Sequence, residues 1–307
     1  MKEIARAGAR ALVGLALWLA IGQACAGPRN PDYSPPRMVQ VLGYNGHMME
    51  PFLTRDGRLL FFNNRNDPSD QTDLHVAQRM DDTSFRYLGP LMGANSAELD
   101  GVASLDTRGN FYFVSARDYA STGNTLWAGR FTGAGVVEVH PLVTDFTPKR
   151  LLRLNIDLEI SADGETLYVA ENRWNLLRGV PATSDITMAR RDGARFIRLP
   201  NADAMMSNIN TNKLEFAPAT SRDGLTLYFT RLDMKALLKK RPGAFAILRA
   251  TRPDTSSPWG IPQPVSVVTG QAEGPSVTPD GCGLYFHRKD GEIFHLYFTR
   301  DRACAPQ

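Results

Sequence analysis

Histidine and acidic side chains occur at two places far apart in the chain, and their types suit acid–base chemistry. His47 and Glu50 precede one aromatic-rich segment, and Glu273 and His287 lie close together near the other end. Imidazole and carboxyl groups can pass a proton to and from a substrate, so these four are our candidate catalytic residues. They can also bind a divalent metal, calcium or another cation, as cofactor. The alternative is a polar seam of hydrogen-bonded residues.

Further charged residues recur at corresponding places and form a second set, the candidate binding residues. The carboxylates among them suit the binding of a cation or a sugar, or the two-carboxylate chemistry of glycoside hydrolysis. The alternative is that the arginines pair with carboxylates or loop carbonyls as part of a repeated structure. Tyr119 and Trp174 can stack on a sugar ring or cap their loops. The charged members are Asp100, Asp157, Glu215, Arg65, Arg117, Arg173, Arg231 and Arg288, with Glu98 and Glu159 beside them.

Two loop segments carry additional charge. Asp67, Asp70 and Asp73 are spaced so that they can hold calcium, but they lack the glycine and terminal glutamate of an EF-hand loop, and a solvated turn is the alternative. The stretch 232–245, LDMKALLKKRPGAF, predicts a short basic helix. As a lid this helix would favour acidic ligands; otherwise it is a solvated insertion.

Several catalytic motifs are missing from the sequence, namely a Gly-x-Ser-x-Gly elbow, a His-Glu-x-x-His pair, a P-loop and paired Cys-x-x-Cys. The composition, 43% hydrophobic and 22% charged, is that of a globular chain. The net charge of +3 falls to about +1 without the first 26 residues, because this segment is basic. No nucleic-acid partner is predicted.

The candidate residues are carried by a repeat that occurs five times. Each copy has a short strand, a turn glycine and an aromatic-rich strand, which is the pattern of a tight hairpin. Examples are PFLTRDGRLLFFNNR from Pro51 and PSVTPDGCGLYFHR from Pro275. The turn glycines follow at intervals of 52 to 60 residues and are Gly57, Gly109, Gly164, Gly224 and Gly281.

A third and a fourth strand follow in most copies, so each repeat predicts a four-stranded blade. The last copy lacks its fourth strand, while an unassigned strand, Tyr33–Leu42, precedes the first copy. A ring closes when one end of the chain completes the blade begun by the other, which removes exposed sheet edges. The predicted fold is therefore an all-β, five-bladed β-propeller of four-stranded blades, closed by the N-terminal strand. In it, the acids lie where the inner strands begin, at the upper face, and the turn glycines lie at the lower face.

The units EISADGETLYV and PSVTPDGCGLYF resemble the WD40-like (PD40) repeat of TolB-type β-propellers. The resemblance covers nearly all of residues 33–300. It implies a propeller independently of the strand count, and because TolB is similar to a six-bladed design it makes six blades the alternative. It implies no particular chemistry, since this repeat occurs in binding modules, peptidases and lyases.

The start of the chain is typical of a signal peptide. Basic residues precede the apolar run ALVGLALWLAIG, and the small residues at 24–26 suit cleavage before Gly27. We therefore predict a signal peptide at 1–26, a single propeller domain at 27–307 and a periplasmic or secreted location. A retained membrane anchor is the alternative, although the run is short for a spanning helix and no other stretch is suitable. Cys282 and Cys304 then predict a disulfide at the lower face.

These observations predict a ligand-binding or scaffolding protein of the cell envelope that uses its upper face. The expected partner is an envelope glycan or an envelope protein, and the expected state is a monomer. The alternative is a glycan-active hydrolase or lyase that uses acidic and histidine residues at the channel mouth.

Overall fold

The computed structural model describes residues 31–66, 71–145, 153–175 and 180–304, so the predicted signal peptide lies outside the described residues. From residue 31 onward the chain forms one unit. Its described residues form mainly strands, together with three helices of four or five residues: α1 (Tyr119–Thr122), α2 (Ala202–Met205) and α3 (Met234–Leu238). Within the described ranges, no helix has the length and apolar character needed to cross a bilayer.

The strands form sheets of four, four, nine and five strands. Within them, most strands fall into successive antiparallel sets along the chain, which we call blades and number in chain order. The first two blades contain β3 (Met49–Leu53), β4 (Leu59–Asn63), β5 (Leu74–Arg79) and β6 (Ser84–Pro90), then β7 (Asp100–Leu105), β8 (Asn110–Ser115), β9 (Leu126–Phe131) and β10 (Val136–Pro141). The third and fourth contain β12 (Arg153–Ile160), β13 (Thr166–Asn175), β14 (Val180–Asp192) and β15 (Arg195–Arg198), then β16 (Leu214–Thr220), β17 (Thr226–Leu232), β18 (Phe245–Thr251) and β19 (Gln263–Pro264). The fifth contains β20 (Ala272–Val277), β21 (Gly283–Asp290), β22 (Ile293–Arg300) and β1 (Arg37–Met38).

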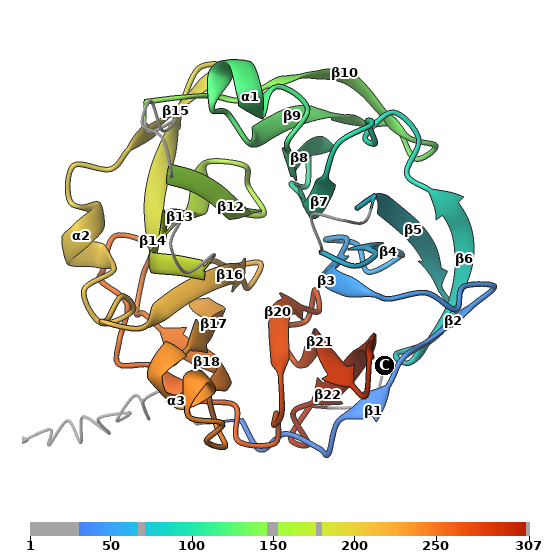
Figure 1. Cartoon of the computed structure of the whole chain (residues 1–307), viewed down its shortest axis with the longest axis vertical. Coiled ribbons are helices and arrows are strands. Elements are labelled where there is room, and N and C mark those ends of the chain that lie inside the picture. Colours follow the sequence, from blue (N-terminus) through green and yellow to red (C-terminus); the bar gives the residue numbers. More distant parts are fainter. Residues whose placement is uncertain (1–30, 67–70, 146–152, 176–179, 305–307) are drawn as a thin grey trace, which may run out of the picture. The chain divides into compact units, whose positions relative to one another are not determined.

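The blades stand around a central axis, with the first strand of each blade innermost (Figure 1). The inner strands contact one another in a closed cycle, β3 to β7 to β12 to β16 to β20 and back to β3. A single parallel pair, Ser184 with Leu214, joins the third and fourth blades into one sheet. The predicted all-β propeller is confirmed, and each inner strand presents part of its length to the axis.

Local side-chain chemistry forms the turn that ends each inner strand. In the first blade the Thr54 hydroxyl donates to the Asp56 carboxylate at 2.6 Å, and this carboxylate accepts the Arg58 N–H. Gly57 follows Asp56 in the left-handed region, with φ +74°, where a residue without a side chain is favoured. Equivalent hydroxyl–carboxylate pairs recur in three other blades: Ser161–Asp163, Ser221–Asp223 and Thr278–Asp280.

Neighbouring blades are joined by arginine–tyrosine contacts. Arg252 at the edge of the fourth blade donates to the Tyr168 hydroxyl of the third at 3.1 Å and to the Gly224 carbonyl at 2.9 Å. Arg191 of the third blade makes the same contact with Tyr112 of the second. These bonds hold one blade against the next and so keep the inner strands in place around the axis.

The junction between the first and second blades is apolar instead. The Phe61 ring lies edge-on to Phe131 at 5.2 Å between centroids and to Phe111 at 5.4 Å. All three belong to one buried hydrophobic cluster. Aromatic packing therefore takes the place of the arginine–tyrosine bond at this junction.

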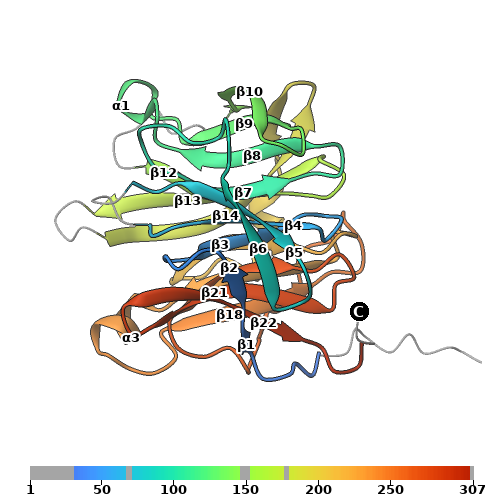
Figure 2. The ribbon, with the colours of Figure 1, turned by 90° about the vertical axis from the view of Figure 1, so that its right-hand side faces the viewer.

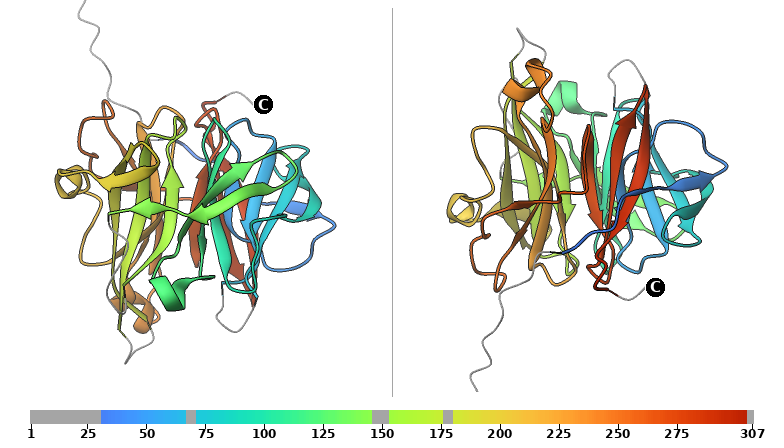
Figure 3. Two further views of the ribbon diagram at one scale, coloured as in Figure 1. Left: turned by 90° about the horizontal axis from the view of Figure 1, so that it is seen from above. Right: turned by 90° about the horizontal axis from the view of Figure 1, so that it is seen from below.

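The N-terminal segment closes the ring. β1 pairs antiparallel with β22, and the Val39 N–H donates to the Leu296 carbonyl at 2.8 Å. The expected single strand Tyr33–Leu42 is divided, however, because β2 (Gln40–Leu42) leaves the fifth blade and pairs in parallel with β6 of the first. Figure 3, right, shows this blue segment crossing from the red strands toward the first blade. One segment therefore joins the two blades at the seam.

The predicted disulfide is confirmed. Cys282 follows the lower turn of the fifth blade, and it is bonded to Cys304, which lies 22 residues further along the chain. The Asp301 N–H also donates to the Cys282 carbonyl at 2.9 Å. The bond therefore anchors the end of the last strand beside the lower face.

Candidate active site

The inner strands share an irregularity that sets the direction of their side chains. In all five, the register with the second strand shifts a few residues before the turn. Four of them have a left-handed residue there, seven positions before the turn glycine: Glu50 (φ +46°), Val102 (+53°), Ala217 (+49°) and Gly274 (+62°). This conformation costs about 1–2 kcal/mol for a residue with a side chain. Such strain held in place by the surrounding structure is often found at functional sites.

Three carboxyl groups from three inner strands gather at this level. Burial raises the pKa of Asp157, on β12, to about 6, although the Ala217 N–H donates to it at 3.1 Å. Burial and the Asp157 charge raise the pKa of Glu273, on β20, to about 7. Burial, Asp157 and Glu273 together hold the pKa of Glu50, on β3, well above its usual range. We call Glu50, Asp157 and Glu273 the acid cluster.

His287 supports this cluster from behind. It is fully buried, and its Nδ1 accepts the Glu50 N–H at 3.2 Å. In the neutral ring the proton is therefore on Nε2, which has no hydrogen-bond partner among the described residues. Burial lowers the pKa of His287 to about 3, so the ring is neutral at physiological pH. It holds the strained backbone of Glu50 and carries no charge of its own.

His47 lies at the edge of the same region. Its Nδ1 accepts the Phe294 N–H at 3.3 Å. The ring of Phe294 lies 6.1 Å from the His47 ring and 5.6 Å from the His287 ring, between centroids. Both predicted histidines therefore pack on one phenylalanine, with Glu50 close to His287 and Glu273 paired opposite His287 in the sheet.

Gly274 allows the closest approach within the site. A Cβ at this position would lie 2.6 Å from Glu50 Oε2 and 2.8 Å from His287 Nδ1. Real side chains do not approach so closely, so the Glu50 carboxyl group occupies space that only glycine leaves free. The sequence gives no direct sign of this contact.

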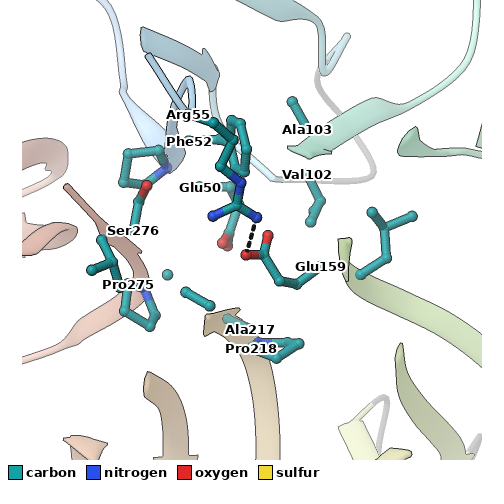
Figure 4. A pocket seen from close by; sticks show the side chains of 15 residues that line it. Glu50, Phe52, Arg55, Val102, Ala103, Glu159, Ala217, Pro218, Pro275 and Ser276 are labelled. Carbon is teal, nitrogen blue, oxygen red and sulfur yellow. Dashed lines mark hydrogen bonds and ion pairs between the residues drawn. The ribbon is translucent and has the colours of Figure 1, made fainter. Parts of the chain in front are cut away.

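An ion pair closes the axial channel below the acid cluster (Figure 4). Arg55 crosses the channel to Glu159, with 2.6 Å between the charged atoms and side chains only 9% and 4% exposed. The Arg55 guanidinium also donates to the carbonyls of Leu105, Ile160 and Thr220. The cavity at this ion pair has a volume of about 30 Å³, which is room for about two water molecules, and Glu50 is the member of the acid cluster that lines it.

Some predicted binding residues are engaged within their own blades. Asp100 binds Arg117 at 2.7 Å, and Glu215 binds Arg231 at 2.6 Å, with both carboxylates fully buried. Arg288 pairs with Asp290 at 3.0 Å and lies over the Tyr297 ring. These five predicted residues form the ion pairs that the structural alternative describes, and none of them lines the axial cavity, while their role in binding stays a prediction.

The remaining predicted residues lie away from the axial cavity. Arg65 and Arg173 are exposed, and Tyr119, on α1, and Trp174, on β13, are half-buried. Of the predicted calcium loop, Asp67 and Asp70 lie outside the described residues. Among the residues that are described, no group of three or more histidine, cysteine or acidic side chains is placed to hold a metal ion.

Sequence reasoning missed Arg55 altogether and named Glu159 only as a neighbour of the candidate binding residues. The available signal was the Arg-Asp-Gly turn of the first repeat, where Arg55 directly precedes the turn carboxylate. An arginine there looks like a solvated turn residue. Its side chain instead turns toward the axis and closes the channel.

No protein-family model and no curated protein matches the chain. Solved structures do share its fold. A structure described as a BT0996 RGII complex has a TM-score of 0.59 at 10% identity, over 90% of this chain and 95% of that one. A family 117 glycoside hydrolase produced by Zobellia galactanivorans has a TM-score of 0.57 at 9% identity, over 88% of this chain and 90% of that one. An endo-arabinase from Bacteroides thetaiotaomicron has a TM-score of 0.52 at 14% identity, over 88% of this chain and 99% of that one. At these identities the likeness concerns the fold.

Proposed function

We propose that this propeller binds a glycan at the upper mouth of its channel and cleaves it by acid–base chemistry, as a hydrolase or a lyase. The observation that carries the proposal is the acid cluster: three carboxyl groups, from three blades, whose pKa values are all raised above their usual range. Glycan cleavage needs one group that holds a proton and another that accepts one.

The pKa values suggest roles for the acid cluster. Asp157, with a pKa of about 6, is mostly ionised near pH 7 and serves as the base. Glu50 serves as the acid, because burial and two neighbouring carboxyl groups hold its pKa well above the usual range. Glu273, with a pKa of about 7, is one of these neighbours and raises the pKa of Glu50 through its own charge. His287 positions Glu50 through the backbone bond and takes no part in proton transfer.

The test is a polysaccharide screen of the purified protein. Release of reducing ends reports cleavage, and ultraviolet absorbance of an unsaturated product separates a lyase from a hydrolase. We expect Glu50→Gln and Asp157→Asn to lose at least about 100-fold in rate, the typical contribution of one positioned acid or base. Glu98→Gln is the matched control, because Glu98 is an exposed acid near the start of an inner strand. Full activity of Glu50→Gln would contradict the proposal.

A second candidate is a binding or scaffolding protein without turnover. It is favoured by the small cavity at the Arg55–Glu159 ion pair and by the ion pairs that engage Asp100 and Glu215 within their blades. In this case a glycan or protein of the envelope binds the upper face. Saturable binding with no cleavage by the wild type, and no effect of Glu50→Gln, would support this candidate over the enzyme.

We further propose that residues 1–26 are a cleaved signal peptide and that the mature protein is a periplasmic or secreted monomer. The disulfide supports export, because such bonds persist in oxidising compartments. N-terminal sequencing of the protein from cell fractions tests cleavage before Gly27, and light scattering tests the monomer.

A further inference from the structure

A groove that the proposed chemistry does not use lies between the third and fourth blades. Its volume is about 920 Å³. One wall is the start of β16, with Asn212, Lys213 and Leu214, and another is α3 with the residue before it. Figure 2 shows α1 and α3 at the same end of the strands, which is the upper face. The groove therefore opens on the face where the proposed substrate enters.

The groove and its α3 side are positively charged. Lys213 pairs with Asp233 at 3.2 Å between the charged atoms, so these two charges largely offset each other. Lys235, on α3, is exposed and has no ion-pair partner among the described residues. The exposed run 239–241, Lys-Lys-Arg, continues the charge directly after the helix.

An apolar surface adjoins this charge. Leu238 lines the groove and is 72% exposed, and Met234 lines it as well. A ligand that suits the groove thus combines negative groups with carbon–hydrogen surface. Sugars that carry carboxylate or sulfate groups have this combination, since their ring faces are apolar and their substituents are charged.

β16 links the groove to the acid cluster. The strand runs from Leu214, at the groove, to Ala217, whose N–H is bonded to Asp157. Three residues of strand cover about 10 Å, so both places lie within reach of one short oligosaccharide. A glycan held at α3 would therefore extend toward Asp157.

We propose that this groove binds the anionic groups of an acidic glycan, and that the substrate of the channel site is therefore a polysaccharide with uronate or sulfate groups. The claim that this polysaccharide is a substrate rests on the proposed function. The groove's preference for acidic glycans does not depend on it. Lys235 is the residue expected to contact the anionic groups.

The experiment measures binding by calorimetry at low salt, with an oligogalacturonate, a heparin oligosaccharide and a neutral arabino-oligosaccharide as probes. We expect both acidic probes to bind more tightly than the neutral one. Lys235→Gln should weaken this binding about fivefold and Lys235→Glu about tenfold or more, since one exposed charge contact is modest. Added salt should weaken it as well. Arg58→Gln is the control, because Arg58 is 84% exposed beside the lower turn.

Equal binding of the neutral and acidic probes, or unchanged binding of Lys235→Glu with an unchanged melting temperature, would overturn the proposal. The proposal would also be overturned if polyglutamate bound as tightly as the acidic sugars and with the same dependence on Lys235. That result would assign the groove to acidic peptides. If the acidic probes bind in a way that depends on Lys235 but are not cleaved, the proposal for the groove is supported and the proposed enzyme activity is contradicted. If a neutral glycan is cleaved in a way that depends on Glu50 but not on Lys235, the proposed enzyme activity is supported and the proposal for the groove is contradicted.

Discussion

Replacing Glu159 by glutamine removes the negative partner of Arg55 and leaves its shape nearly unchanged. The Arg55 guanidinium would keep its bonds to the carbonyls of Leu105, Ile160 and Thr220. It would lose the carboxylate at 2.6 Å in a place where both side chains are almost inaccessible to water. Breaking a buried pair on one side costs about 3–5 kcal/mol, because the remaining charge stays buried without an opposite charge beside it.

The expected change is large enough for differential scanning calorimetry at pH 7. The unfolding entropy is about 2 cal/mol/K per residue, so for about 280 residues a loss of 1 kcal/mol lowers the melting temperature by about 2 °C. Glu159→Gln should therefore melt about 5–9 °C below the wild type. Glu165→Gln is the matched control, because Glu165 and Arg108 form an exposed pair at 2.9 Å that is worth at most about 1 kcal/mol.

Two outcomes would refute this reasoning. One is a fall in melting temperature for Glu159→Gln no larger than that for Glu165→Gln. The other concerns the double variant Arg55→Met with Glu159→Leu, which removes both charges and should recover most of the lost stability. If the double variant is as unstable as Glu159→Gln, then packing rather than the unpaired charge explains the loss.

Three further predictions follow from the site and the seam. Gly274→Ala should lose cleavage activity and about 2 kcal/mol more stability than Gly281→Ala, because only the first methyl group meets neighbouring atoms while both backbones are left-handed. Equal losses in urea unfolding would contradict this. Burial raises the pKa of Glu273 to about 7, so the wild type loses stability as the pH rises from 4.5 to about 7 and this carboxyl group must ionise in the folded protein. Glu273→Gln does not ionise, so its stability relative to wild type should increase between pH 5 and pH 8. A difference in melting temperature that stays constant with pH would count against it. Replacing Cys282 and Cys304 by serine should cost about 3 kcal/mol on loop-entropy grounds, and a reductant should then have no additional effect on melting.

Much of the fold could be predicted because its information is local. The hydroxyl–carboxylate turn around Gly57 and its repeats can be read from neighbouring residues, and the aromatic strands follow directly. The division of Tyr33–Leu42 could not be read in this way. Strands of two and three residues carry little pattern of their own, and their partners are the open outer edges of β22 and β6. Only the assembled ring presents those edges.

The candidate site was predictable in part. The sequence placed acids at the start of each inner strand, and Glu50, Asp157 and Glu273 do gather there. The sequence could not distinguish these three acids from Asp100, whose side chain forms an ion pair with Arg117. The difference depends on the irregular register of each inner strand, and valine or glutamate in a left-handed conformation gives no sequence signal.

The closure of the ring by β1 has a consequence for the order of assembly. Arg37 pairs with Phe298, so about 260 residues separate the two strands of this last pairing. Bringing the ends of such a chain together costs about 5 kcal/mol of loop entropy, apart from a constant. The hairpins of single blades join near neighbours and carry little of this cost. We therefore expect the blades to form from neighbouring strands first and the seam between the fifth and first blades to form last. Until then the outer edge of β22 stays open to pairing with another chain.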